Sequence, residues 1–478
     1  MNYRMISYTL GWVMRIEGAA MLLPFICSFI YNEQNKWVFL VSGLICFLVS
    51  IPMTLKTPKN KTMFAKEGFV IVALSWILIS IFGAIPFILS GAIPNFIDAL
   101  FETASGFTTT GASILSDVEA LPKSALFWRS FTHWMGGMGV IVFLVALLPL
   151  SGGENLHLIR AESPGHTVGK LVPRVRSTAK ILYGIYILFT FLEIILLLAG
   201  GCPLFDALTL SFGTAGTGGF AIRNSGIADY SSYIQIVITI FMVIFGIDFS
   251  FYYLILMRKI KTAFKMEEVL IYIGIILVAI TLIFFNIKGM FPNDADALKH
   301  TAFQVSAIIT STGYSTVDFD LWPQFAKTIL LLLMFCGACT GSTGGGMKVS
   351  RIAILFKSII KEIKVLAHPK TTLKIKMSGR PIEHETLRGI NVFFISYMFI
   401  FALAFLLISL DDLDFTTNFT AVLTTISNIG PGLSKIGPTC NFSVYSGISK
   451  MIFTLVMIIG RLEIFPILVL FSKNTWKK

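Results

Sequence analysis

Residues 302–316 read AFQVSAIITSTGYST, an apolar helical run that ends in Thr310-Ser311-Thr312-Gly313-Tyr314. Glycine next to small hydroxyl residues allows the backbone to turn, because glycine adopts a positive φ at little steric cost. A turn of this kind can direct several backbone carbonyl oxygens toward one point. The stretch therefore predicts a short helix followed by a loop that presents carbonyl oxygens.

Three other parts of the chain repeat this pattern. Each has a short apolar or mixed run that an acidic residue opens, then a loop of glycine and small residues, and each lies between two long hydrophobic segments. The four opening acids are Asp98, Asp206, Asp296 and Asp414, and the four loops are residues 107–112, 214–219, 310–314 and 426–431. Four copies of helix, short helix, glycine loop and helix would suit a four-fold pore.

The composition is that of an integral membrane protein. The chain has 478 residues, of which 55% are hydrophobic and 13% are charged, whereas a soluble domain carries about 25% charged residues. The formal net charge of +12 is explained by basic cytoplasmic links between spans. Because the chain has no basic domain with interleaved aromatic residues, we expect no nucleic acid among its partners.

Long apolar runs that approach about 20 residues are candidate membrane spans, and the chain has ten of them. An extra N-terminal hairpin is expected in residues 1–55, and pore repeats are expected in residues 56–153, 154–258, 259–360 and 361–478. The predicted spans are residues 11–31, 37–55, 69–90, 124–150, 181–200, 233–257, 269–287, 326–360 (interrupted), 390–410 and 447–471.

The charges sort the connecting segments onto two sides of the membrane. The links between repeats and the C-terminal tail are basic, which predicts that they and both termini are cytoplasmic. The segments around the glycine loops are acidic, Glu102 among them, and we expect an outer ring of carboxylates that attracts cations; the alternative is that these acids are merely solvated. The fold class expected is an all-α membrane protein of four parallel repeats around a pseudo-four-fold pore.

The four loops are the candidate ion filter. Irregular backbone within a membrane must be buried or must line water, and carbonyl oxygens replace the hydration shell of a weakly hydrated cation, which favours K⁺ over Na⁺. No loop places a carboxylate in the filter, which argues against Ca²⁺. Alignment of the loops on their last common glycine selects Thr109, Thr110, Gly111, Gly216, Thr217, Gly218, Ser311, Thr312, Gly313, Asn428, Ile429 and Gly430 as filter residues with K⁺ as their ion.

The second span of the third repeat contains a dense run of small residues that cannot form a straight helix. Its spacing is similar to that of a nucleotide-binding P-loop, but Met347 stands where the lysine should be. A flexible intramembrane loop is therefore the better interpretation. The residues of this loop are Gly337, Gly341, Ser342, Thr343, Gly344, Gly345 and Gly346.

Two further polar residues lie within predicted spans. Arg461 is costly there, by about 3 kcal/mol or more. It either pairs with Glu463 or with backbone carbonyls to hold helices together, or it places a charge near the pore that repels a second cation. His133 precedes a glycine-rich run at residues 134–139, so we expect a helix-packing histidine and close helix contact.

At these residues the chain resembles the TrkH-type subunits of the Trk/Ktr/HKT superfamily of potassium transporters, whose members carry one filter glycine per repeat. The chain matches this pattern with Gly111, Gly218, Gly313 and Gly430, and the resemblance covers essentially the whole length, including the N-terminal hairpin. It implies a gate at the intramembrane loop and a pore charge at Arg461. It also implies a homodimer that carries a cytoplasmic ring of nucleotide-binding (RCK-type) regulatory subunits in the bacterial cytoplasmic (inner) membrane.

Two functions follow from these observations. The first is potassium uptake through a channel-like pore, with K⁺ as the transported ion, no covalent cofactor, and any nucleotide held by the regulatory partner. The second is a coupled secondary transporter of sodium, protons or a small solute, which inverted repeats or intramembrane acids near the breaks would favour. An enzyme is not expected, because the chain has no paired membrane histidines, no serine–base arrangement and no complete metal motif. The basic inner links also suit anionic membrane lipid.

Overall fold

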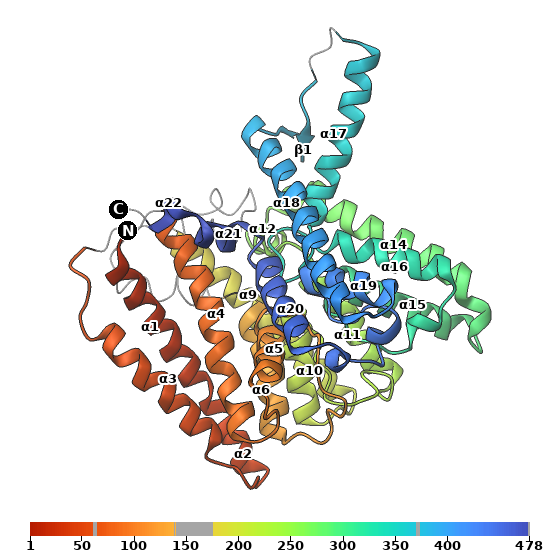
Figure 1. Ribbon diagram of the computed structural model, residues 1–478. Coiled ribbons are helices and arrows are strands. Elements are labelled where there is room, and N and C mark those ends of the chain that lie inside the picture. The colour runs from red at the N-terminus through yellow and green to blue at the C-terminus, as the bar shows by residue number, and fades with distance from the viewer. Residues whose placement is uncertain (61–64, 138, 140–174, 370–372, 477–478) are drawn as a thin grey trace.

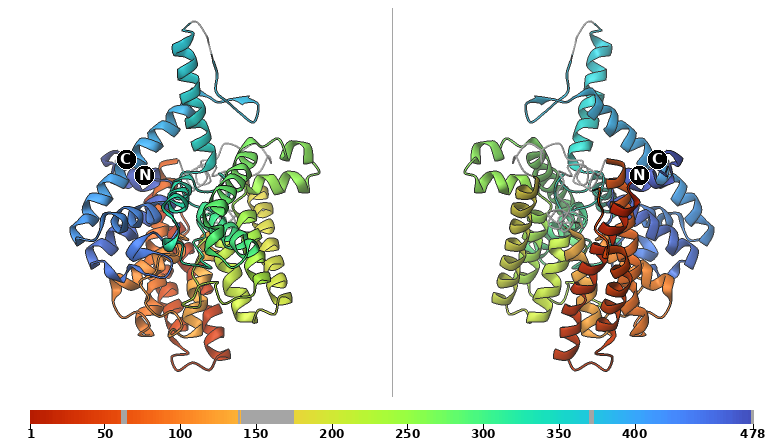
Figure 2. Two further views of the ribbon diagram at one scale, coloured as in Figure 1. Left: turned by 90° about the vertical axis from the view of Figure 1, so that its right-hand side faces the viewer. Right: turned by 90° about the vertical axis from the view of Figure 1, so that its left-hand side faces the viewer.

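The computed structural model describes residues 1–60, 65–137, 139, 175–369 and 373–476. Regular structure in these residues is helical, apart from a hairpin of β1 (Lys376–Met377) and β2 (Arg380–Pro381). Both chain ends lie on the side from which α17 (Val349–Ala367) projects, and the turn between α2 and α3 lies on the opposite side (Figure 1). The side views show the same helical body with α17 and the β-hairpin extending from one end (Figure 2).

The predicted N-terminal hairpin is present. It consists of α1 (Tyr3–Ala20) with α2 (Leu22–Ile30), followed by α3 (Val38–Thr54). A Cβ at Gly18 would lie 2.9 Å from the carbonyl oxygen of Gly43, and a Cβ at Gly43 would lie 2.9 Å from the carbonyl oxygen of Gly18. Glycine at both positions therefore allows the backbones of α1 and α3 to touch. The first helix begins at Tyr3, earlier than predicted, because the Asn2 side chain accepts a hydrogen bond from the Met5 N–H and caps the helix.

Four repeats follow the hairpin, each with a first helix, a short pore helix and a second helix. The first repeat has α4 (Ala65–Leu89), α5 (Phe96–Phe107) and α6 (Lys123–Gly137), and the second has α9 (Val175–Ala199), α10 (Leu204–Gly216), α11 (Ser232–Phe245), α12 (Phe249–Leu256) and α13 (Ile260–Ala263). The third has α14 (Glu267–Ile287), α15 (Asp294–Ile309), α16 (Gln324–Cys336) and α17, and the fourth has α18 (His384–Ile408), α19 (Phe415–Ile426), α20 (Gly447–Arg461) and α21 (Phe465–Phe471), before α22 (Lys473–Trp476).

The predicted uninterrupted spans 233–257 and 447–471 are wrong, because both are broken helices. The axes of α11 and α12 meet at 87°, and those of α20 and α21 at 119°. At the first break, the Asp248 side chain accepts a hydrogen bond from the Ser250 N–H at 2.8 Å and so caps α12. At the second break, Glu463 and Ile464 both have a positive φ, which a helix does not allow. A broken second span is therefore shared by repeats two, three and four. The predicted span 124–150 runs beyond the described residues, so the total of ten spans stays a prediction.

The pore helices begin as predicted, at acidic residues. Asp98, Asp206 and Asp296 each occupy the first turn of their helix, and Asp414 is the N-cap of α19. A carboxylate is stabilised there by the positive end of the helix dipole. These four acids therefore help to start helices that run into the protein and end near its centre.

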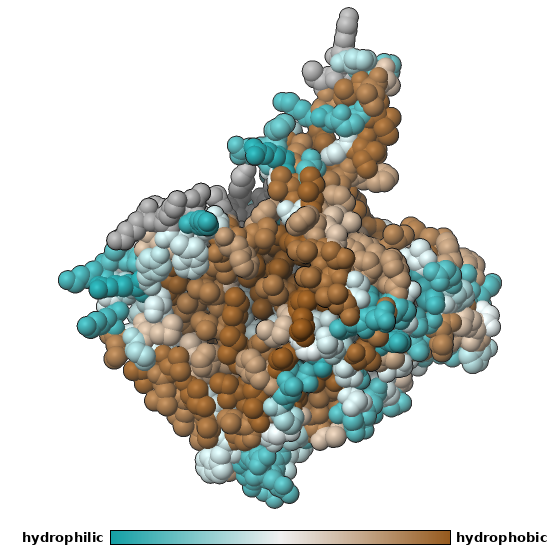
Figure 3. Space-filling model, in the orientation of Figure 1, coloured by the Kyte–Doolittle hydropathy of each residue, from teal (hydrophilic) through white to brown (hydrophobic). Residues whose placement is uncertain are grey.

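The outer surface carries a broad apolar band. Figure 3 shows it in brown over the helical body, with polar residues at the two ends. Large apolar side chains such as Leu48, Phe191 and Phe399 are more than half exposed, which would be costly in water over so large an area. In the part of the chain that the structure describes, five helices are long and apolar enough to cross a membrane, or up to seven spans if each bent pair counts as one. The band therefore faces lipid.

Candidate functional site

All four pore helices end in the same backbone turn. In each, an N–H donates to the carbonyl oxygen five residues earlier at 2.9 Å, and the donors are Thr110, Gly218, Thr312 and Ile429. The residue before each donor has a left-handed φ of 53° to 58°, and these residues are Thr109, Thr217, Ser311 and Asn428. This is a Schellman motif. It fixes which residues of the four loops are equivalent.

One residue after each donor, each loop has a glycine with a positive φ, and these are Gly111, Gly219, Gly313 and Gly430. Each of them packs on the backbone of another repeat. A Cβ at the first three would overlap the carbonyl oxygens of Gly218, Thr312 and Ile429, respectively, and a Cβ at Gly430 would lie 2.7 Å from the carbonyl oxygen of Thr110. The contacts run from repeat one to two, three, four and back to one. The four loops therefore form a closed ring, which we call the carbonyl ring.

The predicted alignment of the second loop is wrong by one residue. Gly219, and not Gly218, is the counterpart of the glycines in the other loops. Gly218 occupies the same position as Thr110, Thr312 and Ile429, and it is glycine because a Cβ would overlap the imidazole ring of His133. The sequence has glycine at 216, 218 and 219, so glycine spacing alone allows more than one alignment. The structure decides between them, because α10 continues to Gly216 and the left-handed residue is Thr217.

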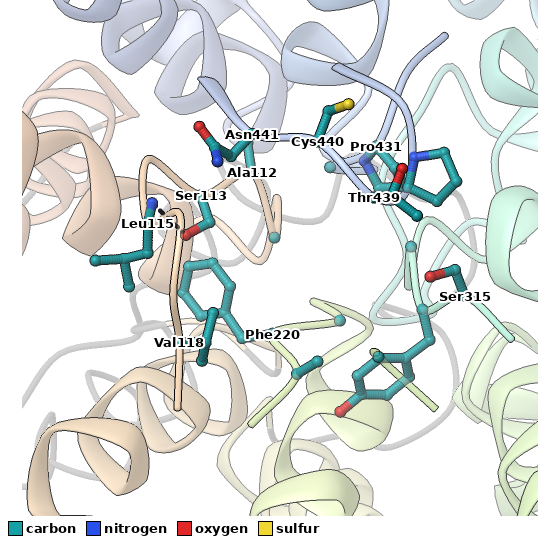
Figure 4. A pocket seen from close by; sticks show the side chains of 18 of the residues that line it. Ala112, Ser113, Leu115, Val118, Phe220, Ser315, Pro431, Thr439, Cys440 and Asn441 are labelled. Atoms are coloured by element: carbon teal, nitrogen blue, oxygen red, sulfur yellow. Dashed lines mark hydrogen bonds between the residues drawn. The ribbon is translucent and has the colours of Figure 1, made fainter. Parts of the chain in front are cut away.

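An outer pocket opens above the carbonyl ring. Its lining includes the four ring glycines, and Figure 4 shows Ala112, Phe220, Ser315 and Pro431 around the opening, one from each repeat. None of the described residues that line this pocket is Asp or Glu. The C-terminal ends of the four pore helices carry the negative ends of their dipoles to the ring. Backbone groups, and not carboxylates, therefore supply the negative potential at this site.

The predicted ring of attracting carboxylates is corrected in part. Glu102 is fully buried and forms an ion pair with Arg129 at 2.8 Å, so it does not face the mouth. Asp98 likewise pairs with Lys450 at 2.7 Å. Asp117 does lie on the exposed outer surface, where a hydrogen bond from the Asn224 side chain lowers its pKa. Outer acids of this kind mainly hold the loops together.

The intramembrane loop lies under the carbonyl ring, on the side away from the outer pocket. A Cβ at Gly344 would lie 2.8 Å from the carbonyl oxygen of Thr310, and one at Gly345 would overlap that of Ser427. The Gly345 N–H donates to Ser311 Oγ at 2.5 Å. The loop therefore packs on the ends of the third and fourth pore helices, and the lack of side chains at these glycines permits the contact.

The same loop also reaches the second repeat. Thr217 Oγ1 donates to the carbonyl oxygen of Thr343 at 2.9 Å. Further along, the Phe249 N–H donates to the Gly341 carbonyl oxygen, and the Cys339 N–H donates to that of Gly246, both at 3.1 Å. The break between α11 and α12 thus binds the loop by its backbone.

The remaining loop residues stabilise the loop itself. Gly337 has a φ of 70° at the end of α16, and both Gly341 and Gly346 have similar positive values. Ser342 Oγ donates to the Cys339 carbonyl oxygen at 2.6 Å. All seven predicted loop residues therefore lie in one non-helical segment between α16 and α17.

Arg461 joins the loop to the first repeat. Its guanidinium donates to the carbonyl oxygens of Thr343 at 2.8 Å and Gly137 at 3.0 Å, and also to that of Gly136. The predicted pairing with carbonyls is confirmed. The carboxylate of Glu463 forms an ion pair with Arg351.

Comparison with known proteins gives one consistent result. The model of the cation transport protein family TrkH matches residues 35–291 and 289–478. The chain belongs to the TrkH family. It is 34% identical to the Trk system potassium uptake protein TrkH of Salmonella typhimurium and 33% identical to TrkG of Escherichia coli, with 99% or more of each chain covered. The crystal structure of the potassium transporter TrkH from Vibrio parahaemolyticus matches with a TM-score of 0.90 and 29% identity over all of both chains.

His133 packs between two repeats of this TrkH-family chain, as predicted. The Phe220 N–H donates to its Nε2 at 3.2 Å, so Nδ1 carries the proton and donates to the Gly106 carbonyl oxygen at 2.7 Å. The glycine-rich run makes the expected close contact, because a Cβ at Gly137 would lie 2.6 Å from the α-carbon of Gly216.

Sequence reasoning missed the charged residues that hold the intramembrane loop. Glu268, at the start of α14, accepts hydrogen bonds from the N–H groups of Thr340 at 2.6 Å and Ser350 at 3.2 Å. Lys348 is buried and donates to the Gly344 carbonyl oxygen. Glu268 and Lys348 both lie at the ends of apolar runs, where charged residues are usual. The sequence therefore does not set them apart from other charged residues, and only the position of the loop in the structure shows their role.

Proposed function

We propose that this chain is the ion-conducting subunit of a potassium uptake system. The observation that carries the proposal is the carbonyl ring, in which four glycines without side chains bring the carbonyl oxygens of Thr110, Gly218, Thr312 and Ile429 around one axis. Its relatives from Salmonella typhimurium and Escherichia coli are potassium uptake proteins by name, which agrees with this proposal.

The chemistry of the ring favours K⁺. Carbonyl oxygens substitute for the water of a large, weakly hydrated monovalent cation more readily than for that of Na⁺. A divalent ion would need carboxylate ligands, and the described lining of the outer pocket contains no Asp or Glu, while two arginines, Arg129 and Arg223, belong to it. The filter residues of the second repeat are then Thr217, Gly218 and Gly219, while those of the other repeats remain as predicted.

The intramembrane loop is the proposed gate. It fills the space under the ring through Gly344 and Gly345, and it is held there by hydrogen bonds that include those of Arg461, Glu268 and Lys348. Movement of this loop away from the helix ends would open a path without any change in the ring. Arg461 supports the closed position, because its guanidinium binds the loop carbonyl of Thr343.

A homodimer and a cytoplasmic regulatory ring complete the proposal. The projecting α17 exposes a stripe of Phe356, Ile359, Ile363 and Leu366, visible in brown in Figure 3, and a second copy of the chain would cover it. The segment from Leu256 to Lys265 exposes both apolar and basic side chains, which suits anionic lipid at the inner surface. We place both termini and α17 in the cytoplasm of a bacterial cell, because the links on that side are basic.

A coupled transporter is the second candidate, because intramembrane acids lie next to the breaks. Asp248 is buried at the α11–α12 break, and a Cβ at Gly341 would lie 2.7 Å from its carboxylate. Glu268 binds the N–H groups of Thr340 in the loop and of Ser350 in α17. Either acid could exchange a proton when the loop moves, which would couple proton entry to K⁺ entry.

Flux through liposomes that contain the purified chain tests both functions. We expect radioactive Rb⁺ to enter down its gradient, with excess K⁺ competing and Na⁺ competing weakly. A pH gradient should leave the rate unchanged if the pore is channel-like. Rb⁺ accumulation that follows the pH gradient, at zero membrane potential, would establish the coupled mechanism instead.

A further inference from the structure

A buried ion pair lies beside the seam between the first and second loops of the carbonyl ring. Glu102 of α5 and Arg129 of α6 are 2.8 Å apart, and their side chains are 0% and 2% exposed. Within the described ranges of the chain, no other ion pair buries both of its side chains to this degree. Two buried charges of opposite sign must remain together, because separation would leave an uncompensated charge in a low dielectric.

Glu102 binds the first loop of the ring, and Arg129 reaches both the first loop, through Ser113 Oγ at 3.4 Å, and the second. Glu102 accepts hydrogen bonds from Ser113 Oγ at 2.9 Å and from the Ile114 N–H at 3.0 Å. These two residues follow Gly111 closely in the first loop. The carboxylate therefore fixes the part of the chain that leaves the ring in repeat one.

Arg129 makes the corresponding contacts with the second loop. It donates to the Ala221 carbonyl oxygen at 3.2 Å, and its guanidinium lies 4.1 Å from the ring centroid of Phe220. Both residues come directly after Gly219. The His133 imidazole binds the Phe220 N–H and the Gly106 carbonyl oxygen of α5, so a continuous set of contacts links the two loops.

The other three repeats lack this arrangement. At the position of Glu102, counted back from the left-handed residue, they have Leu210, Gln304 and Ala421. None of the three carries a charge. Among the described residues, a carboxylate at this helix position is therefore found in repeat one alone; in repeat two, Asp206 at the start of α10 binds Arg223 instead, and the side chains of that pair are 10% and 36% exposed.

We propose that the Glu102–Arg129 pair is a specificity-determining positioning element, which holds the carbonyl oxygens of Thr110 and Gly218 at the spacing that suits dehydrated K⁺. The inference rests on the proposed function of the carbonyl ring. Charge-assisted hydrogen bonds are short and directional, and groups that orient the ligands of an ion tune its affinity without touching it. The pair acts through the loops and contacts no ion.

The test compares two neutralised acids on one helix. Glu102→Gln keeps the shape of the side chain and removes the charge that Arg129 needs. Asp98→Asn is the matched control, because Asp98 lies on the same pore helix and pairs with Lys450, away from the loops. In liposomes with the purified full chain, we expect the ratio of Rb⁺ to Na⁺ flux to fall about tenfold in the first variant and to stay unchanged in the control.

A second variant covers the case in which Glu102→Gln does not fold. Arg129→Lys retains the buried charge but loses the guanidinium that reaches Ala221, so the flux ratio should fall while the protein remains folded. Equal ratios in folded Arg129→Lys and the unmodified chain would refute the inference. If the unmodified chain itself does not discriminate between Rb⁺ and Na⁺, the carbonyl ring is not a K⁺ filter, and the proposed function fails instead.

Discussion

Gly219 packs so closely against Thr312 that a Cβ would overlap the Thr312 carbonyl oxygen. This contact joins repeats two and three, and equivalent contacts join every other neighbouring pair of repeats in the ring. The adjacent Gly218 is also glycine, but it accommodates the His133 imidazole. Two neighbouring glycines are thus required for different reasons: Gly219 for its contact with Thr312, and Gly218 for its contact with His133.

Gly219→Ala should reduce the selectivity of transport. Its φ of 74° is unfavourable for alanine by about 1–2 kcal/mol, and the added methyl group displaces the Thr312 carbonyl oxygen. We expect Na⁺ to compete with Rb⁺ uptake at least about tenfold more strongly. Gly274→Ala is the control, because no atom lies within 4 Å of its added Cβ. Unchanged Na⁺ competition in folded Gly219→Ala would show that the ring does not select the ion.

Much of the architecture was predictable from the sequence. The short helices Phe96–Phe107 and Phe415–Ile426 were predictable as elements, because an acid opens each apolar run and a glycine loop closes it. The register of the second loop was not predictable, since it depends on the end of α10 and on contact with His133. Glycine patterns show where a chain can turn, but neighbouring backbone decides which glycine is required.

The broken helices were missed for a different reason. Apolar residues continue through Asp248 and through Glu463, so a hydropathy average does not detect the bends there. Burial of Glu102 was missed because its partner Arg129 is distant in sequence and lies at the start of a predicted span. Local caps and tertiary ion pairs of this kind need the packed structure.

Cys440 provides a probe of the outer pocket. It lines that pocket and is exposed, whereas the other five cysteines of the chain are buried. A positively charged, membrane-impermeant methanethiosulfonate reagent added outside should therefore attach a cation to Cys440 beside the pore. The attached charge should reduce Rb⁺ uptake several-fold. Cys440→Ser is the control and should be resistant. Full uptake after verified labelling of Cys440 would place the conduction path elsewhere.

Gly345→Ala should open the proposed gate. Its Cβ would overlap the Ser427 carbonyl oxygen, so the loop cannot stay under the ring. We expect a higher basal Rb⁺ flux, by about tenfold or more, with the ratio of Rb⁺ to Na⁺ flux unchanged. Gly289→Ala, where nothing lies within 4 Å, serves as the comparison. A lower flux in Gly345→Ala would mean that the loop is needed for conduction and does not gate it.

Substitutions of Arg461 can distinguish a role as a tether of the intramembrane loop from a role as a positive charge near the pore. Arg461→Lys keeps the positive charge but cannot bind the separate carbonyls of Thr343 and Gly137 together. If the arginine acts as a tether, this variant should raise basal Rb⁺ flux nearly as much as Arg461→Gln. Wild-type flux in Arg461→Lys, with altered flux in Arg461→Gln, would show that the charge near the pore is the important property.

The apolar stripe on α17 predicts that the chain is a dimer. Ile359 and Ile363 are 58% and 61% exposed and lie one turn apart on a helix that projects from the body (Figure 1). A glutamate at either position would place a charge in the interface, which is costly to bury. We expect Ile359→Glu/Ile363→Glu to halve the protein mass measured by light scattering in detergent, whereas Lys364→Ala on the same helix should not change it. A double variant that keeps the wild-type mass would exclude α17 as the dimer contact, and a wild-type chain that is already monomeric would exclude the homodimer.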